Sequence, residues 1–186
     1  MSAPIEYIPG FITDPDAAFA ELLTLDFERR DTTPRSEYFC SDYPDPYSYG
    51  RGRGIRTYSP RPYHPRILSV RADLEKRFGC VLDVCFINRY HDQSDHLGWH
   101  ADDSPEMDDL RPIITVSLGA VREIWFRPIP DKAATGGSPA TEKLTLEHGS
   151  ACVMLPHMQE SWEHRIPKAS STCGERLSMV YRGYVR

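Results

Sequence analysis

The chain has 186 residues, of which 40% are hydrophobic and 26% are charged, and its formal net charge is −5. This length and composition predict one soluble globular domain with one substantial core, and the negative charge argues against a protein that coats nucleic acid by bulk attraction. No apolar run approaches the roughly 20 residues that span a bilayer, and the N-terminus lacks the basic and apolar regions of a secretory signal. We expect a cytoplasmic monomer with no membrane association.

The cysteines support the same compartment. Their number is odd, five in all, and no two of them form a Cys-x-x-Cys pair, so we expect reduced thiols and no disulfide framework. Cys80, Cys85 and Cys152 lie among apolar residues and are expected in the core.

Two helices are predicted in the first 80 residues. Asp14 and Pro15 have the residue types of a helix N-cap and first position, and the apolar residues that follow are typical of an amphipathic helix. A second helix is predicted over Pro65–Phe78, ended by Gly79. Between them, residues 31–65 are rich in Pro, Tyr, Gly and Arg and predict loops with short strands.

The remainder of the chain has the pattern of a mainly β protein. Short strands are predicted at residues 81–90, 113–118, 121–127, 142–147, 150–155 and 176–185. Turns are expected at Gly119 and Gly149, and residues 130–141 have the composition of an exposed, mobile hairpin loop. Many short strands with turn signals between them indicate a sandwich or barrel.

Charge is distributed unevenly along the chain. Basic residues dominate the segment 51–77, and acidic residues dominate 102–109. A basic segment beside an acidic site fits phosphate contacts around a catalytic pocket. A solvated basic surface that binds nothing explains the same pattern equally well.

The strongest chemical signal is His100-Ala101-Asp102 together with His164 and Arg176. A His and an Asp two residues apart point the same way along an extended segment, and His164 can complete a three-sided metal site. Two imidazoles and one carboxylate leave open positions, as in non-haem Fe(II) oxygenases. Arg176 offers a planar fork for a carboxylate. A co-substrate that chelates iron and carries a second carboxylate, such as 2-oxoglutarate, fits both features.

A helical zinc pair formed by His96 and His100 is a conceivable rival. Gly98 and the turn-like residues 92–95 make a helix there improbable on sequence grounds.

The neighbouring residues resemble those of the AlkB family of Fe(II)/2-oxoglutarate-dependent nucleic-acid dealkylases, in particular the branch with the animal DNA-repair members. The resemblance covers residues 80–186 strongly and 30–79 more loosely. It rests on five ordered blocks: Asn88-Arg89-Tyr90, Asp95 to Asp103, Pro112 to Gly119, Ser161 to Pro167, and Arg176 to Arg182.

This resemblance implies a double-stranded β-helix, or jelly roll, with flanking helices. It implies one domain over residues 1–186, with helices and a nucleotide-recognition lid in 1–79 and the catalytic core in 80–186. The implied cofactor and co-substrates are Fe(II), 2-oxoglutarate and O₂, with His100, Asp102 and His164 as iron ligands and catalytic centre. The implied reaction hydroxylates an N-alkyl group of a base, which leaves as an aldehyde while 2-oxoglutarate becomes succinate.

The co-substrate contacts follow from the same resemblance. It assigns Arg176 to the distal carboxylate of 2-oxoglutarate and Arg182 to the iron-proximal end, with hydrogen bonds from Asn88 and Tyr90. Ser178 stands where the family usually has Asn, so one contact is lost or mediated by water. From the residues alone, Arg182 could instead be a buried structural Arg with a carboxylate partner.

For the substrate, a base must leave its stack to reach a buried metal, and an aromatic platform must receive it. Alignment with the family's recognition lid makes Tyr58 the expected stacking partner opposite His100. Arg56, Tyr47 and Tyr49 are lesser candidates.

Trp99 can be read equally as core or as pocket wall. Asp103 is expected to contact an exocyclic amine, because Ser104 replaces the acidic residue that the family usually has at that position. No apolar finger of the kind that wedges open a duplex is evident in the segment 27–33, which is short and charged. We therefore expect single-stranded or distorted DNA to be favoured, with RNA possible.

Two other functions remain open from the sequence. The same oxygenase chemistry could act on a protein side chain or a small molecule. A non-catalytic jelly-roll binding module with an accidental metal site is the second alternative.

Overall fold

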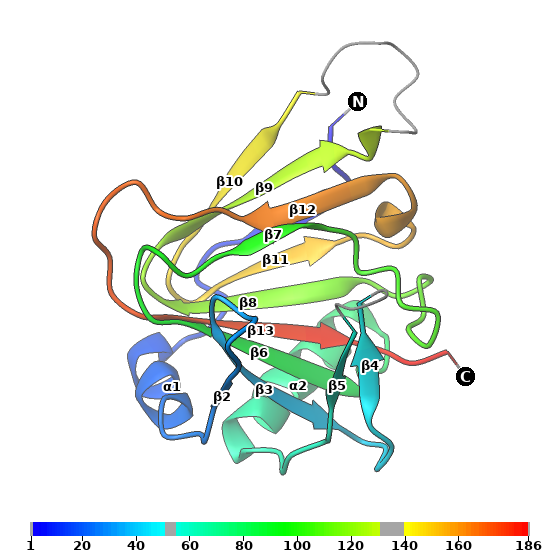
Figure 1. Ribbon diagram of the computed structural model, residues 1–186. Helices are drawn as coiled ribbons and strands as arrows, with labels where there is room; N and C mark the ends of the chain where they lie inside the picture. The colour runs from blue at the N-terminus through cyan, green and yellow to red at the C-terminus, as the bar shows by residue number, and fades with distance from the viewer. Residues whose placement is uncertain (1, 51–54, 131–139, 186) are drawn as a thin grey trace.

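Two antiparallel β-sheets face each other in the computed structural model, which describes residues 2–50, 55–130 and 140–185 (Figure 1). The larger sheet has seven strands, in the spatial order β1 (Ile5–Ile8), β11 (Ser150–Met154), β8 (Ile113–Gly119), β13 (Arg176–Arg182), β6 (Val84–Tyr90), β3 (Ser36–Ser41) and β2 (Glu28–Arg29). The smaller sheet has four, in the order β10 (Glu142–Leu146), β9 (Arg122–Pro128), β12 (Trp162–Ile166) and β7 (Leu97–His100). A separate hairpin is formed by β4 (Tyr47–Tyr49) and β5 (Arg56–Tyr58).

This architecture confirms the predicted fold class, a mainly β jelly roll with flanking helices. All six predicted strands from residue 81 onward are present, with ends shifted by a few residues. Gly119 and Gly149 have φ values of 87° and 77°, which favour glycine. A Cβ atom at Gly119 would also lie 2.4 Å from the carbonyl oxygen of Glu175. Most of the predicted hairpin loop at 130–141 lies outside the described residues.

Two helices cover the outer face of the larger sheet, α1 (Pro15–Leu22) and α2 (Pro65–Phe78). The predicted bounds of α2 are confirmed, and Gly79 ends it with a left-handed φ of 63°. Asp14 is the N-cap of α1 by position, although its side chain makes no capping hydrogen bond. A 3-10 turn, η3 (Met158–Glu160), precedes β12. Among the described residues, no helix is long and apolar enough to cross a membrane.

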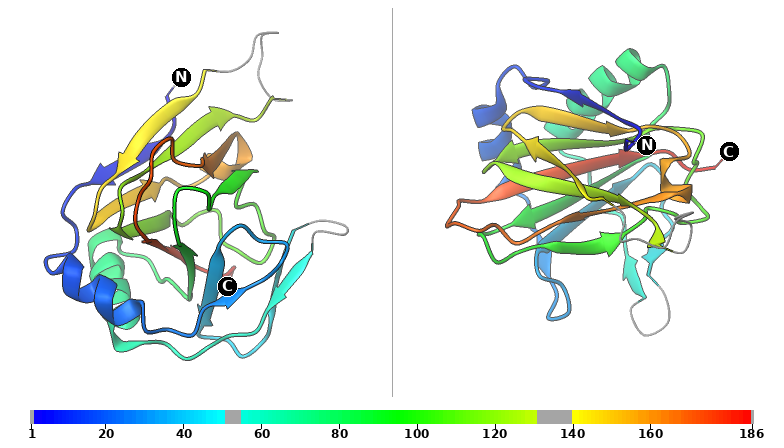
Figure 2. Two further views of the ribbon diagram at one scale, coloured as in Figure 1. Left: turned by 60° about the vertical axis from the view of Figure 1, so that its left-hand side comes forward. Right: turned by 90° about the horizontal axis from the view of Figure 1, so that it is seen from above.

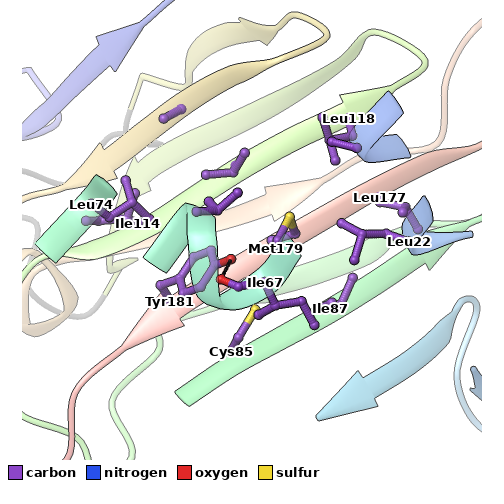
Figure 3. Close-up of a cluster of buried hydrophobic side chains, with 14 of the residues drawn as sticks. Leu22, Ile67, Leu74, Cys85, Ile87, Ile114, Leu118, Leu177, Met179 and Tyr181 are labelled. Carbon is purple, nitrogen blue, oxygen red and sulfur yellow. Dashed lines mark hydrogen bonds between the residues drawn. The ribbon is translucent and has the colours of Figure 1, made fainter. Parts of the chain in front are cut away.

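The main core lies between these helices and the larger sheet (Figure 3). Alternate residues of the central strands point to this side, as β geometry requires. Leu177, Met179 and Tyr181 of β13 pack there with Leu22 of α1 and Ile67 of α2. The opposite face of the same strands looks into the space between the two sheets, visible from two directions in Figure 2.

The boundary expected at residue 79 does not divide the sheets. β1, β2 and β3 all precede it, yet each is a strand of the larger sheet. β1 pairs with β11 and β3 with β6, so the first 79 residues complete the sheet that holds the site as well as supplying the helices and the β4–β5 hairpin. All five cysteines are free thiols.

Candidate metal and co-substrate site

A cavity between the two sheets is lined in part by the β4–β5 hairpin and by His100 at the end of β7. Both sheets and the hairpin contribute to its lining. Polar residues of the lining include His100, Asp102, His164, Asn88, Ser178 and Arg182. Apolar side chains such as Leu97, Ile124 and Val180 form much of the remaining wall.

His100, Asp102 and His164 converge in this cavity. His100 ends β7 and is the register partner of His164 on β12, and Asp102 follows two residues after the end of β7. The Nε2 atoms of His100 and His164 lie 3.6 and 3.7 Å from the two carboxylate oxygens of Asp102. One ligand atom from each residue fits within 4.8 Å of the others, and the described part of the chain holds no other such group. This is the geometry of a three-sided metal site.

The protonation states also suit a metal. Burial raises the pKa of Asp102, but Arg182, His100 and His164 outweigh it, so the net pKa lies below the usual value. Burial, and then the neighbouring His100, lowers the pKa of His164 to about 3. At neutral pH the site therefore holds a carboxylate and a neutral His164 imidazole, the forms that coordinate cations.

The Nδ1 atoms of the two histidines have different surroundings. Nδ1 of His100 lies 2.9 Å from the carbonyl oxygen of Gly98. If Nδ1 donates a hydrogen bond to this oxygen, Nε2 carries the lone pair that can face the site. Nδ1 of His164 is buried and has no hydrogen-bond partner among the described residues.

The loop that carries Asp102 is held on both sides of its peptide unit. Its backbone N–H donates to Oε1 of Gln159 at 2.9 Å, and its carbonyl accepts from Nη2 of Arg182 at 2.5 Å. Ser104, two residues on, is 2.6 Å from the hydroxyl of Tyr47 in the β4–β5 hairpin. Gln159 was not predicted from the sequence, because a lone Gln in a turn gives no signal of this contact.

Arg176 occupies the far end of the polar face of β13. Its side chain is fully buried, with Nη2 donating to Oγ of Ser117 at 2.8 Å and lying 3.4 Å from Oγ of Ser178. Its Nε and Nη1 have no partner among the described residues. Burial lowers the pKa of Arg176 to about 10. A buried guanidinium with unused donors is costly unless a ligand carboxylate accepts from it.

The residues between Arg176 and the metal site are polar as well. Asn88, Ser178 and Ser117 are register partners on three adjacent strands, and Tyr90 lies opposite Arg176, with its ring centre 5.2 Å from the guanidinium carbon. Arg182 donates to the backbone carbonyl of Asp102, and within the described chain no carboxylate lies within ion-pairing distance of its side chain.

Residues 26–182 match the family model described as the 2OG-Fe(II) oxygenase superfamily. The chain belongs to this superfamily. It is 28% identical over 186 residues to bovine alpha-ketoglutarate-dependent dioxygenase alkB homolog 3, an alignment that covers 94% of this chain and 64% of the relative. It is 34% identical over 130 residues to the human DNA oxidative demethylase ALKBH2, covering 68% and 49%. The alignments thus span about half to just under two thirds of these relatives.

These similarities place the oxygenase in the AlkB family. The solved structure of OsALKBH1 supports the fold, with a TM-score of 0.67 at 16% identity over 98% of this chain and 99% of that one. The superfamily implies Fe(II), 2-oxoglutarate and O₂. The donor set fits: His100, Asp102 and His164 would hold the metal, and the unused donors of Arg176 would receive a carboxylate.

Two of the tyrosines predicted to contact a base, Tyr58 and Tyr49, line the cavity of this oxygenase. Tyr58 lines the cavity but is only 5% exposed, its hydroxyl donates to Glu37 at 3.1 Å, and the Arg30 guanidinium carbon lies 4.6 Å from its ring centre. Its ring and hydroxyl are therefore already engaged. Tyr49 is half-buried and lines both the cavity and the open hollow beside His100. Tyr49 therefore borders the open hollow as well as the cavity, whereas Tyr58 lines the cavity alone.

The other predicted substrate residues are spread out. Trp99 is neither core nor cavity wall. It lies on the outer face of the smaller sheet, where its ring centre is 4.2 Å from the guanidinium carbon of Arg127 and 4.9 Å from that of Arg165. Arg56 is absent from the described cavity lining and reaches the carbonyl of Thr32. Asp103 is exposed and lines the open hollow beside His100.

Arg35 lines the cavity and was not predicted from the sequence. It is buried, pairs with Glu37 at 2.7 Å, and donates from Nε to Asn88 at 2.6 Å. Because Glu37 also accepts from Tyr58, this ion pair links the β4–β5 hairpin to the co-substrate side of the cavity. A single Arg within a Pro- and Tyr-rich segment gave no hint of burial.

The expectation for the basic segment 51–77 also needs correction. Arg51 and Arg53 lie outside the described residues. The arginines from 61 onward lie in or before α2, which covers the face of the larger sheet turned away from the cavity. Most of them are paired within the chain: Arg61 with Asp26, Arg66 with Asp14 and Glu21, Arg71 with Asp42, and Arg77 with Glu6. These arginines therefore lie on the far side of the sheet from the cavity, and most of their charge is already paired, so they are poorly placed to bind phosphates beside the site.

Proposed function

We propose that the protein is an Fe(II)/2-oxoglutarate dioxygenase that oxidatively removes N-alkyl groups from bases of DNA or RNA. The observation that carries the proposal is the continuity of one cavity. It joins the His100, Asp102 and His164 cluster to the polar face of β13 on one side and to Tyr49 of the hairpin on the other. The name of the human relative, a DNA oxidative demethylase, supports the same substrate class.

On the co-substrate side, the residues bind and orient. Arg176 would grip the distal carboxylate of 2-oxoglutarate through its two unused donors, and Arg182 lies at the metal end. Asn88 and Ser178 line the path between them. Bound iron, with 2-oxoglutarate and O₂, supplies the oxidising power that hydroxylates the N-alkyl carbon, with succinate, CO₂ and an aldehyde as the other products.

On the substrate side, the residues position the base and exclude water. Tyr49 and the imidazole of His100 border the same opening, so a flipped base would enter between them. The apolar wall formed by Leu97, Ile124 and Val180 keeps the reacting region dry. Gln159 holds the peptide unit of Asp102 in place throughout.

The strand state of the substrate is part of the proposal. The turn between β2 and β3 begins with Arg30 and Asp31, which are polar where an apolar wedge would be needed to open a duplex. Single-stranded or distorted DNA is therefore the favoured substrate, with RNA possible, since flipping then costs less. We also propose that the protein acts as a cytoplasmic monomer.

A turnover screen tests the proposal. The protein would be incubated with iron, ascorbate, 2-oxoglutarate and single- or double-stranded oligonucleotides that carry different N-alkyl bases, and the bases would be analysed by mass spectrometry. The wild type should restore at least one alkylated base, and it should do so faster in single strands than in duplexes. His164→Ala should restore none. Turnover of a methylated peptide or metabolite, without competition from oligonucleotides, would contradict the substrate class.

A further inference from the structure

A row of five alternating cationic and aromatic side chains crosses the outer face of the smaller sheet. Nζ of Lys143 lies 4.3 Å from the ring centre of Trp125, and the guanidinium carbon of Arg165 lies 4.2 Å from the same ring and 4.9 Å from that of Trp99. The guanidinium carbon of Arg127 lies 4.2 Å from Trp99. We call these five residues the cation–aromatic row.

Strand register produces this arrangement. Lys143 of β10, Trp125 of β9 and Arg165 of β12 are direct register partners, so their side chains lie side by side on one face. The alternate residues Phe126 and His164 point inward. Lys143 and Arg165 flank Trp125 from the strands on either side, so the ring is not open for a base to stack on. A ligand would meet the row through its cations, which the rings hold in place.

The charges of the row are only partly compensated. Arg127 pairs with Glu163 at 2.5 Å, and the Glu123 carboxylate accepts from Nε1 of Trp125 at 2.7 Å. Within the residues that the structure describes, neither Lys143 nor Arg165 lies within ion-pairing distance of a carboxylate, and the buried Nε of Arg165 has no hydrogen-bond partner. The arginines of α2 are paired with acidic residues, so the row differs from them in keeping free positive charge.

The row begins at the opening of the site. Trp99 directly precedes the proposed metal ligand His100, and both belong to β7, the edge strand of the smaller sheet. The open hollow beside the cavity is lined by His100, Ala101 and Asp103 at the end of that strand. From β7 the row extends over β12 and β9 to β10, a distance of about 15 Å at the usual strand spacing. A strand that delivers a base to the cavity can therefore continue around this edge.

We propose that the cation–aromatic row is a second contact surface for the nucleic acid, which binds phosphates of nucleotides that flank the target base. The inference rests on the proposed function for the identity of the strand. Phosphate is the matching ligand because Lys143 and Arg165 carry positive charge without a carboxylate partner among the described residues. The contact is independent of base sequence, and it gives an acidic protein a local site for a polyanion.

The test compares the wild type with the double variant Lys143→Gln/Arg165→Gln. Binding of unmodified single-stranded oligonucleotides of about 3 and about 15 nucleotides would be measured by fluorescence anisotropy at several salt concentrations. We expect the short oligonucleotide to bind both proteins alike. For the long one, the loss of two phosphate contacts should lower the salt slope by about 1.4. Affinity should then fall about sevenfold less than for the wild type between 50 and 200 mM salt.

Matched single variants keep the test interpretable if the double variant is unstable. Lys143 is exposed on β10, so Lys143→Gln should fold normally and lower the slope by about 0.7. Lys76→Gln removes the same charge from the exposed face of α2 and should leave the slope unchanged. Equal slopes and affinities for the wild type and Lys143→Gln on the long oligonucleotide would overturn the inference, as would an equal effect of Lys76→Gln.

The outcome is separable from that of the proposed function. Binding of unmodified oligonucleotides requires no turnover, and turnover of a short alkylated oligonucleotide requires no contact with the row. A wild type that demethylates short substrates while the double variant binds long ones normally would contradict only this inference.

Discussion

The two faces of β13 differ in whether their buried polar groups have hydrogen-bond partners. On the helix side, the strand places Leu177, Met179 and Tyr181 in an apolar core, and the Tyr181 hydroxyl donates to the carbonyl of Ile67 at 3.0 Å. On the cavity side, Arg176 and Arg182 are buried with donors that have no partner among the described residues. The same strand thus satisfies its polar group in one direction and leaves donors unused in the other. Unused donors at this depth are best explained as groups that await a ligand.

The largest expected effect on the cavity side comes from the metal cluster. His100→Ala, Asp102→Ala and His164→Ala should each abolish turnover and leave the fold intact, because the three side chains lie at the opening of a preformed jelly roll. Product formation and circular dichroism would be measured together. His96→Ala, in the same segment but outside the cluster, is the control that should stay active. Clear activity in two of the three variants would remove the assignment.

On the helix side, the expected effect is on stability alone. Leu177→Ala should lower the free energy of unfolding by about 2–5 kcal/mol, because it deletes fully buried methyl groups from the core. Ser178→Ala, one residue along on the opposite face, should cost much less. Urea unfolding of both variants measures the difference. Similar losses at the two positions would mean that the faces do not differ as the structure indicates.

Replacement of Arg176 should raise the stability of the ligand-free protein, the opposite of the effect expected for Leu177→Ala. Arg176→Met removes a buried guanidinium with unused donors, so the ligand-free protein should become more stable, by about 1–3 kcal/mol. Affinity for 2-oxoglutarate should fall by roughly 10- to 150-fold, the usual value of one charge-assisted interaction. Melting curves with a redox-inert metal, with and without 2-oxoglutarate, report both quantities. An unchanged shift on adding 2-oxoglutarate would count against the role, and Arg176→Lys should be weakened as well.

The smallest predicted effect separates the two tyrosines at the cavity. Tyr49→Ala should weaken binding of an alkylated oligonucleotide by about 1–3 kcal/mol, the value of one stacked base. Tyr58→Ala should weaken binding less, because the Tyr58 ring already lies 4.6 Å from the Arg30 guanidinium carbon and its hydroxyl bonds Glu37. Turnover of 2-oxoglutarate without substrate should be normal in both. A larger effect at Tyr58 than at Tyr49 would restore the original assignment.

The parts of the fold that were predictable have local causes. The bounds of α2 followed from Pro65 and Gly79, since proline and glycine act at helix ends through their own backbone preferences. Six of the later strands followed from hydrophobic pattern and turns, but β12, which carries His164, was not predicted. β1 and β7 were not predicted, because short strands are defined by pairing with β11 and β12, which no local signal encodes.

The site divides in a similar way. His100, Asp102 and His164 were singled out because metal-ligand spacing is visible in the chain, and the structure brings them together. Gln159 and Arg35 were invisible because their roles depend on tertiary contacts. The orientation of Trp99 was left open, and the face to which it points depends on the register of β7 against β12.

The most direct measurement follows aldehyde and succinate in one reaction. The wild type would receive iron, ascorbate, 2-oxoglutarate and a single-stranded oligonucleotide with an N-methyl base that the screen has identified, and formaldehyde and succinate would be quantified over time. Oxidative dealkylation predicts that the methylated oligonucleotide accelerates both products and that they form in a ratio close to one. Succinate that forms at the same rate with methylated and unmethylated oligonucleotide, without formaldehyde, would contradict the account.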